Sequence, residues 1–388
     1  MTQSNYVYQS DDKLVKSKSL QEIMCADKLN NCKMQLPIII GTDDNYLPVI
    51  ADLAAMPHLI IGGDDYATDQ SLNAMILSLL LKKKPEELKL VILDPMHTEL
   101  VHFTSLKEHY LAFAPRNAEI HERPLRQRLK AVIGVEEEMN RRYQMLLKTK
   151  SHSFKEYNLR QETAGKPGLP YIVMIVNDYQ EFAAFFDKRV ERPVIAIAQK
   201  GRAVGIHVVL RTRNFSSSVI TGMLKANFPA RISFRTNDRL QSKTILDREG
   251  AEILPTGSAL AYFNGSYHLV AGPKCSLADC RKIIAQVVAQ PFGGNAYLLP
   301  DVELPKNVSS CDDTNDSFLN NAVDFATSVS ELSAPMLQRR YTIGYNRATR
   351  LMDTLIELGV VAKEAKDGKH EVLIEPKDVS RILNALTR

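Results

Sequence analysis

The sequence predicts an α/β fold with a mostly parallel sheet and helices on both faces, followed by a C-terminal winged helix-turn-helix domain. Short apolar runs bounded by turn residues alternate with longer amphipathic stretches, which is the order of strands and helices in a parallel sheet. The chain has 388 residues, too many for one ordinary core. After Gln290 the composition shifts to proline, glycine and polar residues, which indicates a linker before a second domain.

The strands are predicted from five apolar runs, at residues 36–40, 58–61, 88–93, 171–176 and 205–210. Between them, apolar residues recur at helical spacing over 71–83 and 125–148. In such sheets ligands bind beyond the C-terminal ends of the strands. We therefore expect the loops after Ile61, Leu93, Val176 and Leu210 to lie together.

The domain boundaries follow from the same changes in composition. We expect a polar arm over residues 1–34, the α/β domain over 35–290, a linker over 291–317 and the winged-helix domain over 318–388. In the last domain three helices precede two short strands, around 360–361 and 371–374, and a closing helix. That order is typical of a winged helix-turn-helix.

Composition limits the class of protein. The net charge is only +4, too small to argue for nucleic acid unless the charge is concentrated on one face. The five cysteines lack metal-ligand spacing, which predicts reduced thiols and no bound metal. The N-terminal residues contain no apolar signal core, and no apolar run is long enough to span a bilayer. These features predict a cytoplasmic protein without direct membrane insertion.

Several segments carry a specific resemblance. They are 49–59, 73–80, Leu93-Asp94-Pro95 followed by Glu99-Leu100, 198–207 (AQKGRAVGIH), 219–222, 225–232, 242–247 and 337–348 (LQRRYTIGYNRA). Together they resemble the FtsK/SpoIIIE family of DNA translocases over roughly residues 35 to 375, in both its motor domain and its DNA-reading γ domain. The resemblance implies a RecA-like, P-loop-NTPase-type motor, double-stranded DNA as partner, hexameric assembly, and a role in chromosome segregation and cell division.

The phosphate loop implied by this resemblance is degenerate. A phosphate loop needs glycines for close backbone approach, a lysine for the phosphates and a hydroxyl for magnesium. Here no lysine or arginine occurs between Gly62 and Leu81. The remnants of the site are Gly62, Gly63, Asp64, Asp65, Thr68 and Asp69. Two like charges about 4 Å apart repel by about 4 kcal/mol at an effective dielectric of about 20, so these aspartates should oppose a polyphosphate.

The other catalytic positions have changed as well. Where the family has an aspartate and a glutamate after the strand ending at Val176, this chain has Asn177 and Asp178, and the family's glutamine sensor is replaced by Arg213. Asparagine holds magnesium less well, and aspartate is one methylene shorter than glutamate. With no nearby residue in place of the lysine, we expect hydrolysis to be lost and no cofactor to be bound. Arg202 matches a position that faces a neighbouring subunit in the family, or it forms an ordinary surface salt bridge.

The C-terminal domain retains the features of a DNA reader. Asn346 is expected to cap a helix running to Leu358, with Asn346, Arg350 and Asp353 on one face and Arg347 beside them. Arginine reads guanine, asparagine reads adenine and a carboxylate accepts from cytosine. The residues expected to contact phosphates are Arg339, Arg340, Lys363, Lys366, Lys369 and His370.

Three functions fit these observations. The first is a DNA-binding pseudo-ATPase that forms a homo-oligomer, or joins and modulates an FtsK-type ring. The second is an active ATP-dependent DNA translocase with an unusual site for ATP and Mg²⁺. The third is a protein-binding adaptor without a DNA function.

Overall fold

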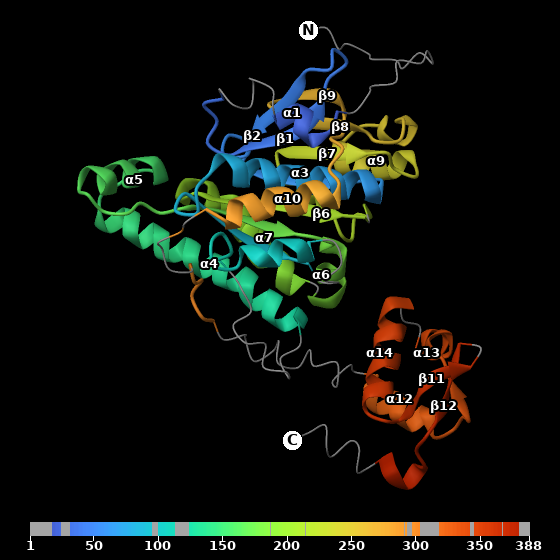
Figure 1. Cartoon of the computed structure of the whole chain (residues 1–388). Helices are drawn as coiled ribbons and strands as arrows, with labels where there is room; N and C mark the ends of the chain where they lie inside the picture. The colour runs from blue at the N-terminus through green and yellow to red at the C-terminus, as the bar shows by residue number, and fades with distance from the viewer. Residues whose placement is uncertain are drawn as a thin grey trace. The chain divides into compact units, whose positions relative to one another are not determined.

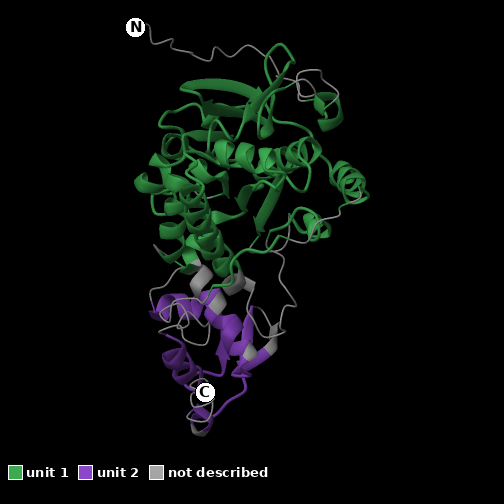
Figure 2. Ribbon diagram, turned by 90° about the vertical axis from the view of Figure 1, so that its left-hand side faces the viewer, with its two compact units in different colours: residues 1–302 green, residues 303–388 purple. Residues whose placement is uncertain are grey.

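The computed structural model describes residues 18–24, 32–94, 100–112, 124–186, 188–213, 215–290, 292, 297–302, 318–341, 345–366 and 368–379. The chain divides into two compact units, residues 1–302 and 303–388, which are coloured separately in Figure 2.

A single large sheet organises the first unit. Its nine described strands are β1 (Pro37–Thr42), β2 (Pro48–Asp52), β3 (His58–Gly62), β4 (Leu88–Leu93), β5 (Tyr171–Val176), β6 (Ile206–Thr212), β7 (Ala230–Phe234), β8 (Ser258–Phe263) and β9 (Ser266–Ala271). Their order in the sheet is β2-β1-β9-β8-β7-β3-β6-β5-β4 (Figure 1). Strands β7, β3, β6, β5 and β4 are parallel, and the remaining strands extend the sheet as antiparallel neighbours. The predicted fold class is confirmed, with a sheet that is mixed rather than almost wholly parallel.

Helices connect and cover these strands. Those of the first unit are α1 (Leu20–Met24), α3 (Asp65–Lys82), η1 (Val101–Leu106), α4 (Pro124–Lys148), α5 (Phe154–Thr163), α6 (Tyr179–Phe186), α7 (Lys188–Lys200), η2 (Gly201–Val204), α8 (Gly222–Ala226), α9 (Arg239–Leu246), η3 (Ala251–Ile253) and α10 (Leu277–Val288). Helix α3 packs on β1 and β3, with α10 beside it, while α6 and α7 pack on β6 and α4 packs on α7. Every residue of β3 and β5 is buried, as expected for strands covered on both faces.

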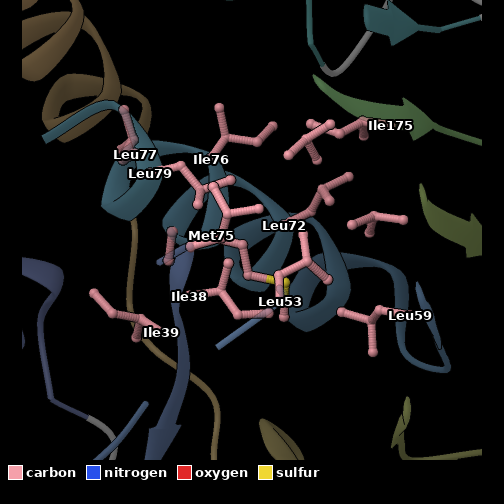
Figure 3. Close-up of a cluster of buried hydrophobic side chains, with 14 of the residues drawn as sticks. Ile38, Ile39, Leu53, Leu59, Leu72, Met75, Ile76, Leu77, Leu79 and Ile175 are labelled. Carbon is pink, nitrogen blue, oxygen red and sulfur yellow. The ribbon is translucent and has the colours of Figure 1, made fainter. Parts of the chain in front are cut away.

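The main core lies between α3 and the sheet. Side chains of Leu72, Met75 and Leu79 on α3 gather with Ile38 of β1 and Leu59 of β3 in one buried cluster (Figure 3). Helix α3 is buried on nearly all sides from its second turn onward, because α10 covers the part that the sheet does not. This packing fixes the helix that follows the predicted phosphate loop.

The second unit has its own core and the element order of a winged helix. It contains α12 (Leu319–Ala326), β10 (Glu331–Leu332), α13 (Ala334–Tyr341), α14 (Tyr345–Glu357), β11 (Val361–Lys366), β12 (Lys369–Val372) and η5 (Pro376–Asp378). The three strands pair in the order β10-β12-β11. Leu337, Leu351 and Leu355 belong to one buried cluster that joins α13 and α14. The expected closing helix falls largely on residues 380–388, which lie outside the described residues.

Part of the expected linker is attached to the first unit. Tyr297 donates a hydrogen bond to Glu138 Oε1 at 2.5 Å and accepts one from Arg142 Nη2 at 3.1 Å. The backbone N–H of Leu299 donates to the Ala112 carbonyl at 3.3 Å. The described end of this segment therefore follows the surface of the first unit, and residues 303–317 of the expected linker lie outside the described residues.

Within the described part of the chain, every helix is too short or too polar to cross a bilayer.

Candidate functional site

The turn between β3 and α3 occupies the position of the predicted phosphate loop, and packing explains both of its glycines. A Cβ atom on Gly62 would lie 2.3 Å from the Thr212 carbonyl oxygen and 2.4 Å from the Phe215 ring. Gly63 has a φ of +111°, and a Cβ there would lie 2.6 Å from the backbone of Phe234. Both glycines are therefore required by neighbouring β-strands and the Phe215 ring, whether or not a nucleotide binds.

The loop itself is shorter than predicted because the helix begins early. Residues 62–71 were expected to form a loop before a helix at Ser71, whereas α3 begins at Asp65. Asp64 is the N-cap: its Oδ1 accepts from the Ala67 N–H at 3.0 Å, and its carbonyl accepts from Thr68 Oγ1 at 2.6 Å. The Ala67 N–H and the Thr68 hydroxyl, two donors with which a helix start could hold an anion, are thus already bonded to Asp64.

A buried arginine fills the space beside this turn. Arg211, near the end of β6, has a fully buried side chain. Its Nη2 lies 2.7 Å from Asp69 Oδ1 and 3.3 Å from Asp65 Oδ1, and its Nη1 donates to Asp178 Oδ1. We call the set Asp65, Asp69, Asp178, Arg211 and Arg213 the arginine–aspartate cluster.

Arg213 closes the solvent side of the arginine–aspartate cluster. Its Nε lies 2.9 Å from Asp178 Oδ1 and 3.3 Å from Asp65 Oδ1, and its side chain is 39% exposed. The loops after β3, β5 and β6 therefore meet at one edge of the sheet, as predicted. Their charged side chains pair with one another in the arginine–aspartate cluster.

The two residues after β5 have separate partners. Asn177 Nδ2 donates to Asp94 Oδ1 at 3.2 Å, and Asp94 Oδ2 accepts from the Leu100 N–H at 3.1 Å. Asp178 turns toward the cluster from a backbone with a φ of +48°, a conformation that costs an aspartate on the order of 1 kcal/mol. Gln180 supports it, donating to Asp178 Oδ1 at 3.3 Å. The rest of the DPK-like motif, residues 95–99, lies outside the described residues.

This geometry corrects two expectations. The sequence suggested three open aspartates and no cation near them, whereas Asp64 caps α3 and Asp65 and Asp69 pair with Arg211. Sequence reasoning missed Arg211. The signal for it was its place near the C-terminal end of a predicted strand, at the same edge as the acidic loop. Carboxylates already pair with both of its terminal nitrogens.

The carboxylates of this cluster are also the side chains of the site that could ligate a metal ion. Among the described residues, no group of three or more His, Cys, Asp or Glu side chains is placed to bind one. In the arginine–aspartate cluster, three carboxylates face two guanidinium groups, so the carboxylates that could attract a cation are already paired.

Arg202 lies apart from this cluster. It is exposed on η2, and none of the ion pairs of the described residues includes it. Its side chain is therefore available on the surface of the first unit.

The predicted DNA-reading residues are all on the second unit. Asp353 is exposed on α14, and Arg339 and Arg340 are exposed on α13. Asn346, Arg347 and Arg350 are in α14 and Lys366 is in β11, but their side chains lie outside the described part. Because α14 begins at Tyr345, Asn346 lies inside the helix instead of capping it.

The backbone supports a shared face on α14. Its buried apolar positions are Ala348, Leu351, Met352 and Leu355. With about 3.6 residues per turn, positions 346, 350 and 353 lie on the opposite side of the helix. The sequence therefore places these three positions on the face that the core of this unit leaves uncovered.

Two of the proposed phosphate contacts also have partners within the second unit. The Arg340 guanidinium lies 5.2 Å from the centre of the Phe325 ring, which orients it through a cation–π contact. Lys369 Nζ lies 3.4 Å from Glu331 Oε2, with both side chains about half exposed. Such surface pairs contribute little stability and yield easily to another ligand.

Comparison with known proteins gives consistent results for both units. Residues 19–217 match the FtsK/SpoIIIE family, and residues 313–375 match the FtsK gamma domain. The DNA translocase FtsK of Chlorobaculum tepidum is 32% identical over 376 residues, covering 94% of this chain and 46% of the relative. That of Haemophilus influenzae is 30% identical, covering 91% of this chain and 71% of the relative. The chain spans about half the length of most of these relatives, for example 48% of the Clostridium tetani protein.

Solved structures support the fold. The cytoplasmic domain of the type VII secretion ATPase EccC from Thermomonospora curvata has a TM-score of 0.59 at 18% identity, covering 75% of this chain and 36% of that one. The pCW3 conjugation coupling protein TcpA, with ATPγS, has a TM-score of 0.56 at 19% identity, covering 66% of this chain and 71% of that one. At this level of identity the likeness concerns the P-loop ATPase-like fold alone.

Proposed function

This chain belongs to the FtsK/SpoIIIE family, and we propose that it is a DNA-binding pseudo-motor whose ATP site has been replaced by an internal ion-pair network. In this proposal the motor-type unit serves as an assembly scaffold in the cytoplasm. The winged-helix unit binds double-stranded DNA.

The observation that carries the proposal is the position of Arg211. Its guanidinium is buried between Asp69 and Asp178, next to the capped start of α3. A bound triphosphate would have to displace it, and breaking a buried ion pair costs about 3–5 kcal/mol. The phosphates would then face the carboxylates of Asp64, Asp65 and Asp69, without a lysine to offset the repulsion. Nucleotide binding is therefore opposed by both the loss of existing bonds and the repulsion of like charges.

The second unit supports the DNA part of the proposal. It matches the family's gamma domain, it has the element order of a winged helix, and positions 346, 350 and 353 share the uncovered face of α14. Arg339 and Arg340 are exposed on the preceding helix, where basic side chains can contact phosphates.

Assembly is the remaining part of the proposal. The exposed Arg202 and the retained fold suggest that the motor-type unit packs beside another subunit, either a second copy or an FtsK-type motor. The process served would then be chromosome segregation at cell division.

The first test is ATP hydrolysis by the purified protein with and without long duplex DNA, with the FtsK of Haemophilus influenzae as the comparator. We expect no phosphate release above background at any DNA concentration, while the comparator responds to DNA. DNA-stimulated turnover that Asp178→Ala abolishes would refute the pseudo-motor and establish an active translocase.

The second test is duplex binding measured by fluorescence anisotropy over a range of salt concentrations. Arg339→Ala and Arg340→Ala should each weaken binding and lower the slope of log K against log salt by about 0.9. Arg350→Ala should weaken binding and relax sequence preference. Lys155→Ala, which removes an exposed charge on α5, is the matched control and should change neither. If all four variants bind duplex DNA with the affinity of the wild type, the result would favour a protein-binding adaptor.

A further inference from the structure

Two buried cysteines at the start of α10 form a pair that the proposed function does not use. Cys275 and Cys280 are 4% and 0% exposed. Their Sγ atoms lie 3.6 Å apart, within hydrogen-bonding distance. Both belong to the main hydrophobic core of the first unit.

Their spacing is set by the cap of the helix. Ser276 is the N-cap of α10, and its Oγ accepts from the Asp279 N–H at 3.1 Å. Asp279 Oδ2 accepts in return from the Ser276 N–H at 3.0 Å, which completes a capping box. Cys275 precedes the cap and Cys280 is the fourth helical residue. These are the two positions at which apolar side chains meet in a hydrophobic staple.

A staple of two cysteines differs from one of two aliphatic residues because its contact can become covalent. A disulfide bond is about 2.05 Å long, so the two sulfur atoms, which lie 3.6 Å apart, need to approach by about 1.5 Å. The hydrogen bond with Cys275 lowers the pKa of the Cys280 thiol, and His102 lowers it further. A thiolate at Cys280 is the form that attacks a disulfide.

The N-terminal helix α1 is hydrogen-bonded to the residues next to this pair. The Leu20 N–H donates to the Lys274 carbonyl at 2.8 Å, and Gln21 Nε2 donates to Asp279 Oδ1 at 3.3 Å. Leu20 and Ile23 are fully buried in the same core as the cysteines. Helix α1 has only five residues, so it can detach at a lower cost than the elements of the sheet.

We propose that Cys275 and Cys280 are a modification site: a dithiol that a small-molecule disulfide converts reversibly into an intrachain disulfide when α1 detaches. The Cys280 thiolate attacks one sulfur of the oxidant and releases one small thiolate. The Cys275 thiolate then attacks Cys280 Sγ and releases the second. The two protons of the protein thiols go to the released thiolates, so the oxidant is reduced to two thiols and the protein loses two hydrogens.

The cysteine pair is also connected to α3, the helix that carries two aspartates of the arginine–aspartate cluster. The Cys275 N–H donates to Gln70 Oε1 at 3.0 Å, and Gln70 follows Asp69 on α3. The disulfide would therefore form at the residue whose backbone joins the start of α10 to the helix that carries Asp65 and Asp69.

The experiment uses the full chain with Cys25, Cys32 and Cys311 each changed to serine, so that only the pair remains. Incubation with glutathione disulfide under native conditions should lower the intact mass by about 2 Da, and peptide mapping should locate the bond between residues 275 and 280. Adding Cys275→Ser should stop the reaction at a glutathione adduct on Cys280. Intact mass that stays unchanged in the folded protein, while the same protein unfolded in guanidinium loses two hydrogens, would overturn the proposal. So would a stable glutathione adduct on the pair.

The role of α1 is tested by the rate of the same reaction. Gln21→Ala removes the hydrogen bond to Asp279, and Leu20→Ala removes a buried contact. Each should speed disulfide formation several-fold. Leu47→Ala, at a residue that is 56% exposed, is the control and should leave the rate unchanged. A rate that none of these variants alters would show that the thiols react by another route and would refute the part assigned to α1.

Discussion

At the scale of single residues, one arginine changes the chemistry of the candidate site. An acidic loop without a lysine repels phosphate, but it would also destabilise the fold if its carboxylates stayed unpaired near a buried Asp178. Arg211 resolves this conflict by bringing a buried positive charge between Asp69 and Asp178. In the folded protein, the acidic turn and this arginine therefore belong to one ion-pair network.

The first residue-scale prediction concerns Arg211. Arg211→Met should lower the free energy of unfolding by about 3–5 kcal/mol, because it leaves the buried Asp178 without its main partner. Arg213→Met removes a partly exposed cation from the same cluster and should cost about 1 kcal/mol or less. Urea denaturation measures both.

A double-variant cycle provides the check on this interpretation. If the cost of Arg211→Met comes from the uncompensated charge, adding Asp178→Asn should recover part of it. Costs that simply add would instead show that Arg211 contributes through packing and not through its pairing with Asp178.

The second residue-scale prediction concerns His58 and His207, whose rings lie 6.1 Å apart in the core. Burial is the main cause that lowers the pKa of His58 to about 3 and that of His207 to about 4, both from 6.5. The folded state thus holds these rings neutral, while the unfolded chain takes up protons below pH 6.5. The contribution of these neutral rings to the free energy of unfolding should be fully present above pH 6.5. It should fall as the pH drops toward 4, by at most about 1.4 kcal/mol per pH unit for each histidine.

Urea midpoints at pH 7, 6 and 5 test this dependence. The double variant His58→Asn, His207→Asn should show a much flatter pH profile between pH 6.5 and 5. His152→Asn, at an exposed histidine, should keep the wild-type slope. A double variant with the wild-type slope would assign the pH dependence to other groups.

At the scale of elements, α3 begins early and shortens the turn that the resemblance identifies as a phosphate loop. A helix start offers its free N–H groups to an anion, but here the Asp64 side chain already accepts from one of them, the Ala67 N–H. Asp64 therefore acts on the site as a cap, in addition to any repulsion by its charge.

The prediction at this scale separates the two roles of Asp64. Asp64→Ala should destabilise the protein by about 1 kcal/mol, because the cap to the Ala67 N–H is lost. Asp64→Asn keeps an acceptor and removes the charge, so its urea midpoint should stay close to that of the wild type. If Asp64→Asn is as destabilising as Asp64→Ala, the charge and not the cap holds the start of α3.

At the scale of the whole molecule, the proposed loss of nucleotide binding can be tested through its effect on stability. A protein that binds a ligand only when folded gains about 2.7 kcal/mol when the ligand is at a hundred times its Kd. We predict that millimolar Mg·ATP leaves the melting temperature unchanged within about 1 °C, because the arginine–aspartate cluster already occupies the site. A rise of several degrees, measured by differential scanning fluorimetry, would show that nucleotide still binds.

Much of the fold could be predicted because its signals are local. Apolar runs bounded by turns gave β4 and β5 with the bounds that the structure has, and helical spacing gave α4 to within one residue. The antiparallel part of the sheet was not predicted, although Asn264 and Gly265, both with positive φ between β8 and β9, form a strong hairpin signal. The start of α3 was misplaced because an expected loop was given priority over the capping residue Asp64.

By itself, the sequence determined the fold class, the family and the loss of the phosphate-binding lysine, since each depends on residue types in a fixed order along the chain. Only the tertiary structure decided what replaced the lysine. Asp65, Asp178 and Arg211 are more than thirty residues apart in sequence, and although the strand pattern predicts that their segments meet, it does not indicate which side chains pair. They form one cluster because parallel strands bring their C-terminal ends to the same edge of the sheet. Buried side chains at that edge can remain charged only when they are paired.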